Sequence, residues 1–369
     1  MRRRLCLDDV ECAVLGGSVF ACGGGGWADH GRELGRLAVT IGRPEIVSID
    51  EIDDNEWIAT AAAIGAPAGS TAWQMLGSDY VRAVELLVEK LGEPLSGLII
   101  GQNGMSSTLN AWLPAALLNL VVVDAVGDMR AHPTGDMGSL GMASNPQSTI
   151  QTAAGGNRDQ GRYLELVICG QTQCASPVLR AAADQAGGFI ASCRNPVRAF
   201  VVREKAAAGG ITRAMNLGRH IIDARPRGPA QVIDAICSST GGSIIMTGRV
   251  AKRELIYTSE AFDIGYIEIL GCDGVYSIRV MNEFMTVEHR GVRLACYPDV
   301  ITVLDSLGDP VSAGRCAPGM EVSLLRVPFE LLPLARGVLD PNIYPIVEKS
   351  LGVSFVDEIL FRAERMLHG

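Results

Sequence analysis

A polar segment that directly follows an apolar one holds the densest group of reactive side chains in this sequence. The segment reads VVVDAVGDMRAHPTGDMG, residues 121–138, and Asp124 closes its β-branched run. Four more ionisable residues follow within a dozen positions: Asp128, Arg130, His132 and Asp136. Carboxylate, imidazole and guanidinium groups transfer protons, bind metal ions and hold anions. This segment is therefore the first candidate for a functional site.

Each of these side chains has a functional and a structural interpretation. Asp124 could act as a base or ligate a metal, or it could cap the following turn. Arg130 could clamp a substrate carboxylate through a bidentate pair, or it could pair with Asp128 or Asp136 and hold the loop. His132 could move a proton or bind a metal, or it could be a structural histidine.

The same loop could hold a metal ion, and zinc is the first candidate. The expected ligands would be Asp124, His132 and Asp136. Zinc sites usually place their ligands at recognisable spacings, but neither HExxH nor HxH occurs in this chain. The sequence therefore leaves the cofactor open and makes metal binding the minority interpretation.

Two further segments contain residues that suit a ligand. The run CGGGGW offers the N–H groups of four glycines to an anion: Gly23, Gly24, Gly25 and Gly26. It matches neither GxGxxG nor GxxxxGK[ST], so a tight turn is an equal alternative. The segment GQNGMSS could bind the amides of a ring or cap a helix, through Gln102, Asn103 and Ser106. Cys22, at an expected strand end, could be a nucleophile, although a buried thiol is favoured.

The elements that would position these loops alternate along the first half of the chain. Six segments are predicted in order: strand 45–52, strand 57–65, helix 79–92, strand 95–101, helix 108–119 and strand 119–125. This order predicts βαβ units and a mostly parallel sheet. Ligands of such sheets bind beyond the carboxyl ends of the strands. We therefore expect the three loops to meet at one edge of the sheet.

The second half changes character along its length. Strands and helices alternate at first, and short strands with turns follow from Gly241 onward. We expect an α/β N-terminal domain over residues 1–162 and a C-terminal domain over 163–369 that ends in a β-rich module. The place of residues 163–222 between the two stays open. MNEFM, residues 281–285, and the Asp-rich turn after residue 298 are interpreted as structural.

Composition excludes several classes of protein. The chain is 48% hydrophobic and 20% charged, with a formal net charge of -9, so a nucleic acid is not expected as partner. No apolar run approaches the roughly 20 residues that span a bilayer. Ten cysteines without any CxxC pair argue against a disulfide framework. We expect a cytoplasmic protein with a small-molecule substrate and no membrane partner; a homo-oligomer is compatible with the apolar content.

Several segments together resemble a known bacterial family. They are CGGGGW, GAPAGS, DAVGDMRAHPTGDMGSLGM, GGSIIMTGRV, MNEF and PDVITVLDSLGDPVSAG, and they cover nearly the whole chain in order. The family is named for S-methyl-thiohydantoin desulfurase and was long filed as a domain of unknown function near hydantoinase and oxoprolinase genes. This chain departs from the relatives at Cys22, where they have Thr, and at GQNG, where Gln102 stands for a glutamate.

The resemblance implies a two-domain enzyme in which water replaces the sulfur of a thiohydantoin-type ring, with release of sulfide. Asp124 or His132 would be the base, and Arg130 would hold a substrate carboxylate. The glycine N–H groups would face the developing charge, while Gln102 and Asn103 would read the ring amides. Two alternatives stay open: a ring-opening amidohydrolase of the hydantoinase or oxoprolinase type, or its subunit, and a non-enzymatic binding protein.

Overall fold

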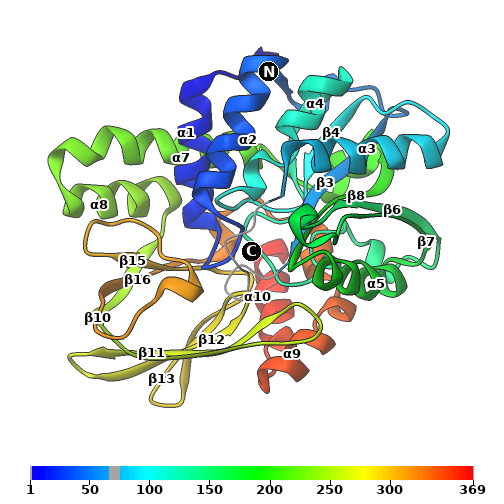
Figure 1. Ribbon diagram of the computed structural model, residues 1–369. Coiled ribbons are helices and arrows are strands. Elements are labelled where there is room, and N and C mark those ends of the chain that lie inside the picture. Colours follow the sequence, from blue (N-terminus) through cyan, green and yellow to red (C-terminus); the bar gives the residue numbers. More distant parts are fainter. Residues whose placement is uncertain (1, 66–74, 369) are drawn as a thin grey trace.

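The computed structural model describes residues 2–65 and 75–368, and its first half is built on a nine-stranded sheet. The order is β1-β2-β5-β4-β3-β8-β6-β7, with β9 beside β5. Figure 1 labels five strands of this sheet: β3, β4, β6, β7 and β8. The neighbours β2, β5, β4 and β3 are parallel, and the flanking pairs are antiparallel. The bounds are β1 (Arg2–Arg4), β2 (Glu45–Val47), β3 (Trp57–Gly65), β4 (Gly97–Ile100), β5 (Val121–Val126), β6 (Thr149–Gly155), β7 (Leu164–Gly170), β8 (Phe189–Arg198) and β9 (Ala207–Ala208). Most of the GAPAGS segment lies outside the described residues.

Helices cover both faces of this sheet because neighbouring strand residues point to opposite sides. Leu98 packs into one hydrophobic cluster with α1, α2, α3, α4 and α7, whereas Ile99 packs on the opposite face, where α5 and α6 lie. The bounds are α1 (Leu7–Phe20), α2 (Ala28–Ile41), α3 (Gly77–Leu91), α4 (Trp112–Leu118), α5 (Thr172–Gln185), α6 (Ala199–Lys205), α7 (Gly210–Ala224) and α8 (Pro229–Thr240). Among residues 2–65 and 75–368, no helix combines the length and apolar character needed to cross a membrane.

The apolar segment before the glycine run is a helix, and the expected strand end at Cys22 is wrong. Residues 7–20 form α1, so the glycine run joins α1 to α2. Every residue from Cys12 to Phe20 is buried. Because apolar residues cover the whole circumference of α1, it lacks the 3.6-residue period by which a one-sided helix is recognised.

The second half contains a separate antiparallel sheet of seven strands, in the order β14-β13-β12-β11-β10-β16-β15. The bounds are β10 (Ser243–Tyr257), β11 (Asp263–Gly271), β12 (Gly274–Met281), β13 (Glu283–His289), β14 (Val292–Cys296), β15 (Val300–Asp305) and β16 (Glu321–Val327). Together with the first sheet, it confirms the predicted class of an α/β domain followed by a β-rich module.

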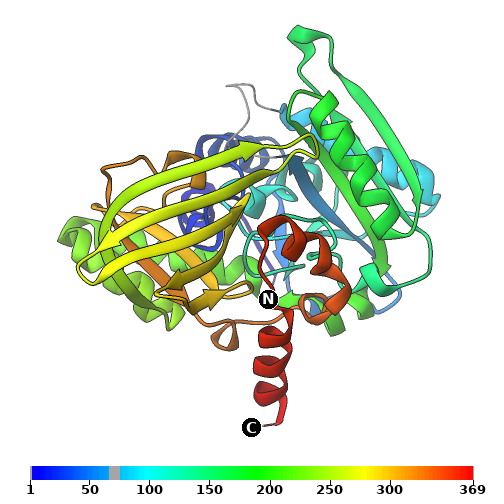
Figure 2. The ribbon, with the colours of Figure 1, turned by 90° about the horizontal axis from the view of Figure 1, so that it is seen from below.

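Residues after 162 contribute to both sheets. β7, β8 and β9 belong to the first sheet, and α7 packs on α1, so residues 163–222 lie with the N-terminal half. The chain ends in α9 (Pro345–Leu351) and α10 (Val356–His368). Figure 2 shows α9 between the two sheets and α10 extending away from them, and α9 contacts β11 and β12.

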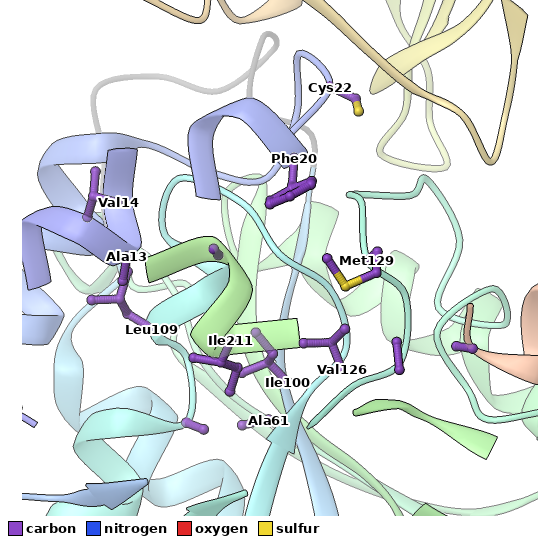
Figure 3. Packing of buried hydrophobic residues seen from close by; sticks show 14 of the residues in the cluster. Ala13, Val14, Phe20, Cys22, Ala61, Ile100, Leu109, Val126, Met129 and Ile211 are labelled. Carbon is purple, nitrogen blue, oxygen red and sulfur yellow. The ribbon is translucent and has the colours of Figure 1, made fainter. Parts of the chain in front are cut away.

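A single hydrophobic cluster connects the two halves. It includes Phe20 of α1 and Val126 of β5, and it continues to Leu304 of β15 and Val327 of β16. Figure 3 shows Phe20, Val126 and Met129 within this cluster, with Cys22 beyond the end of α1. The two sheets therefore share part of their core, which fixes the loops that lie at their junction.

Candidate functional site

The three loops singled out in the sequence line one cavity at the junction of the two sheets. The N–H of Ser106 donates to the carbonyl of Gly25 at 3.0 Å, which joins the first loop to the second. The N–H of His132 donates to Gln102 Oε1, also at 3.0 Å, which joins the second to the third. Four residues named from the sequence as ligand-binding line the cavity: Gly25, Gly26, Gln102 and Ser106. His132 lines it as well.

His132 forms a pair with Asp128 at the wall of this cavity. Its Nδ1 lies 3.2 Å from Asp128 Oδ2, and the two side chains are only 6% and 4% exposed. The hydroxyl of Tyr297 donates to the same Oδ2 at 2.6 Å. Because a carboxylate can only accept, the neutral imidazole in this pairing carries its proton on Nδ1 and has its lone pair on Nε2. Nε2 has no hydrogen-bond partner among the described residues, so this imidazole is oriented to accept a proton.

Two arginines that sequence analysis did not single out line the same cavity. Arg194 of β8 donates through Nε to Gln151 at 2.7 Å and through Nη2 to Ser176 at 2.8 Å. Its Nη1 has no acceptor among the described residues. Arg180 of α5 donates to the carbonyls of Ala261 and Pro133 and stacks on an aromatic ring.

The cavity has an uncompensated positive character. Neither Arg180 nor Arg194 forms an ion pair with a carboxylate of the residues described. Burial lowers the pKa of Arg180 to about 10, with Glu283 the largest opposing influence. Burial also lowers the pKa of Arg194, with Asp136 opposing. Both groups nevertheless remain cationic at neutral pH. Two buried cations without a carboxylate partner make the cavity suited to an anionic ligand.

Glu283, at the start of β13, also lines the cavity, although its segment MNEFM was interpreted as structural. It is 3% exposed, and its Oε2 has no hydrogen-bond partner. Burial raises its pKa to about 8, while Arg130, Arg180 and the N–H of Gly25 act in the opposite direction. This shift favours the neutral carboxylic acid at pH 7.

His30 of α2 also lines the cavity. Its Nε2 lies 3.1 Å from the hydroxyl of Tyr80, and its buried Nδ1 has no partner. Burial lowers the pKa of His30 to about 4, with Asp79 opposing, so the ring is neutral at pH 7. The unpartnered Nδ1 can form a hydrogen bond with a ligand, and the neutral ring adds no charge to the cavity.

The glycine run is required by close packing. A side chain at Gly24 would overlap the carboxyl group of Glu283, and one at Gly26 would overlap the hydroxyl of Ser106. The N–H of Phe284 donates to the carbonyl of Cys22 at 2.7 Å, so the run is attached to β13. The tight-turn interpretation therefore explains the glycines, while Gly25 and Gly26 also face the ligand space. Gly23 and Gly24 do not line this cavity.

Two residues expected to do chemistry have structural partners instead. Asp124 Oδ1 accepts the N–H groups of Ile211 and Thr212, each at 3.0 Å, and so caps the start of α7. Arg130 is fully buried, and its guanidinium donates to the carbonyls of Asp299 at 2.7 Å, Phe284 at 2.9 Å and Ala131 at 2.9 Å. Neither lines the cavity. Both side chains form hydrogen bonds with backbone groups that would otherwise lack partners.

Asn103 and Cys22 are also held away from the ligand space. The amide of Asn103 donates to the carbonyls of Met129 and Gly210, each at 3.2 Å, and so holds the second and third loops together. Cys22 is completely buried, and burial raises the pKa of its thiol to about 11. A thiolate nucleophile at this position would need the opposite shift.

The expected metal ligands are not gathered at one point. Asp124 caps α7, His132 faces Asp128, and Asp136 Oδ1 accepts the hydroxyl of Ser176 at 2.8 Å. Over residues 2–65 and 75–368, no group of three or more His, Cys, Asp or Glu side chains could hold a metal ion. This donor set does not fit a zinc centre, which needs at least three protein ligands.

Replacing Asp124 with Ala is expected to lower the free energy of unfolding by about 0.5 to 2 kcal/mol, because α7 would lose its cap. Ligand turnover by the folded protein should be unchanged. Denaturant unfolding of the variant measures the first effect. Asp8→Ala, at a side chain that is 78% exposed, is the matched control. If turnover were lost while stability stayed unchanged, Asp124 would be a functional residue of the site and not only a helix cap.

Two sheets that share part of one core, with a cavity lined by loops of both, define a two-domain α/β protein with its candidate site at the junction of the sheets. Models of the S-Me-THD-like family match this chain twice, the N-terminal domain at residues 8–160 and the C-terminal domain at residues 171–332. The chain belongs to this family, which confirms the resemblance seen in the sequence.

Comparison with solved structures supports the fold. The chain is similar to a protein from Chromobacterium violaceum solved by X-ray crystallography, with a TM-score of 0.73 and 20% identity over 95% of this chain and 96% of the other. A search of curated proteins found no significant match. The family models divide the chain between residues 160 and 171, although β7 to β9 complete the first sheet.

Proposed function

We propose that this protein is a hydrolase that replaces the sulfur of a thiohydantoin-like ring with oxygen from water. Family membership supports the substrate class. The observation that carries the proposal is the His132–Asp128 pair, which presents an Nε2 without a hydrogen-bond partner at the wall of the cavity. Hydrolytic exchange at a ring carbon needs such a base.

His132 activates the water molecule. Its Nε2 takes a proton as the water oxygen bonds to the ring carbon that carries sulfur. Asp128 holds the imidazole ring of His132 through Nδ1 and stabilises the imidazolium that forms. The hydroxyl of Tyr297 keeps the Asp128 carboxylate in place by donating to Oδ2 at 2.6 Å. The base that sequence analysis divided between Asp124 and His132 is thus assigned to His132.

Arg194 and Arg180 bind the anionic group of the substrate. This role was given to Arg130 from the sequence, but the guanidinium of Arg130 is used by three backbone carbonyls. Arg194 keeps Nη1 for a ligand, and Arg180 lies across the same cavity wall. A carboxylate on the ring would supply the counter-charge that both cations lack.

A panel of thiohydantoins tests this function. We expect a thiohydantoin that carries a carboxylate side chain to give hydrogen sulfide, its S-methyl derivative to give methanethiol, and both to give the same intact hydantoin. Mass spectrometry and a thiol assay measure these products.

Two other outcomes would overturn the proposal. A ring-opened acid that still carries its sulfur would indicate an amidohydrolase. A ligand-induced rise in melting temperature without any product would indicate a binding protein.

A further inference from the structure

Glu283 occupies a position that the proposed water activation does not use. It begins β13 in the second sheet, whereas His132 comes from the loop after β5 in the first sheet, and both line the cavity. Its Oε2 is buried and unpartnered, which is costly for a carboxyl group unless a ligand completes its hydrogen bonding.

The chain leaves room for this carboxyl group in a specific way. At Gly24, the three nearest atoms that an added Cβ would meet all belong to the Glu283 side chain. Asn282 adopts a φ of 57° directly before Glu283, and its Oδ1 accepts the N–H of Asp263 at 2.9 Å. The absence of a side chain at Gly24 and the left-handed backbone at Asn282 thus both accommodate the carboxyl group of Glu283.

We propose that Glu283 is the general acid that protonates the sulfur as it leaves the ring. The inference rests on the proposed function, because it assigns a second catalytic residue to that reaction. A buried carboxylic acid with a free Oε2 can donate a proton directly, and a pKa of about 8 keeps it protonated at neutral pH.

The step balances for an S-methyl substrate. The water oxygen bonds to the ring carbon, the carbon–sulfur bond breaks, and sulfur leaves with the bonding electron pair and takes the proton of Glu283. Of the two protons of water, one ends on the ring nitrogen that was an imine. The other passes through His132 and restores Glu283. One water is consumed, one methanethiol is released, and nothing is oxidised or reduced.

The test compares two leaving groups in Glu283→Gln. An S-methyl substrate expels a basic thiolate that needs protonation, whereas an S-(2,2,2-trifluoroethyl) analogue expels a much more acidic thiol. We expect kcat for the S-methyl substrate to fall about 100-fold or more, and kcat for the fluorinated analogue to fall less than about tenfold. Glu321→Gln, at an exposed glutamate of β16, is the matched control.

A pH profile and a second variant separate catalysis from folding. The wild-type kcat for the S-methyl substrate should fall above about pH 8, and this limb should vanish in Glu283→Gln. Gly24→Ala should displace the carboxyl group and lower kcat in the wild-type background but not in Glu283→Ala, because both changes act on the same group.

Stability gives a readout that does not involve turnover. The pKa of Glu283 is raised in the folded state, from about 4.5 to about 8, so its contribution is complete below pH 4.5 and is lost as pH rises through 8. As pH rises from 4.5 to 8, the melting temperature of Glu283→Gln should therefore increase relative to that of the wild type.

Equal losses for both leaving groups would overturn the role of Glu283 and leave the proposed function intact. Absence of any sulfur product from the wild-type protein would overturn the proposed function itself.

Discussion

Replacing His132 with Ala is expected to lower kcat for sulfur release by about 100- to 10,000-fold, the usual contribution of a positioned general base. KM should change little, because the arginines that bind the substrate anion remain. Steady-state assay of the released thiol measures both constants. His220→Ala is the matched control, since that histidine is exposed and bonds only to Ser239 at 2.7 Å.

Asp128→Asn tests the same pair from its other side. The amide can present its NH₂ to Nδ1, which would move the imidazole proton to Nε2 and block the base. We therefore expect Asp128→Asn to lower kcat while the cavity keeps its shape. Unchanged turnover in both variants would contradict the assignment of the base, even if the protein released sulfur.

Replacing Arg194 with Met is expected to raise KM for a carboxylate-bearing substrate by about 10- to 150-fold. This range corresponds to the roughly 1.5 to 3 kcal/mol of a hydrogen bond to a charged group. A substrate that lacks the carboxylate should bind to the variant and the wild type with similar KM. Arg198→Met, at a half-exposed arginine of the same strand, is the control.

Gly135→Ala provides an independent test of Arg194. A Cβ at this position would overlap its guanidinium group, and the backbone of Gly135 does not have a positive φ. The variant should therefore displace Arg194 and raise KM in the same direction. If KM rose equally for substrates with and without the carboxylate, the anion-binding role would be wrong.

The elements of the first sheet could be predicted where their pattern is local. The strand over residues 57–65 and the helix near residues 79–92 agree with β3 and α3, because a short apolar run marks the strand, and helical spacing with a terminal glycine marks the helix. The strand expected over 45–52 shortens to β2 and a turn. α1 was missed because burial on every side removes its period.

The candidate site was predictable only in part. The sequence placed Gln102, Ser106 and His132 near a common ligand, because strand ends gather at one edge of a parallel sheet. It placed Gly25 and Gly26 there as well, but by way of an expected strand that is the helix α1. It could not show that Asp124 and Arg130 would be used by backbone groups of distant segments, α7 and β13.

Two of the residues that were missed, Arg194 and Glu283, lie in strands β8 and β13. Arg194 stands in the apolar strand FIASCRNPV and Glu283 in MNEFM, and a charged residue within an apolar strand is the signal that could have identified both. Arg180 has no such signal, since it lies on a helix and not in a strand. Its role depends on where α5 packs.

The attachment of the glycine run to β13 limits how this family can be recombined. Gly24 accommodates Glu283, and the carbonyl of Cys22 accepts the N–H of Phe284, although these partners lie in different halves of the chain. A chimera that takes its first half from one relative and its second half from another would join a loop and a strand that were never fitted to each other. Substrate preference in such hybrids would follow the matched pair of segments, which must be inherited or exchanged together.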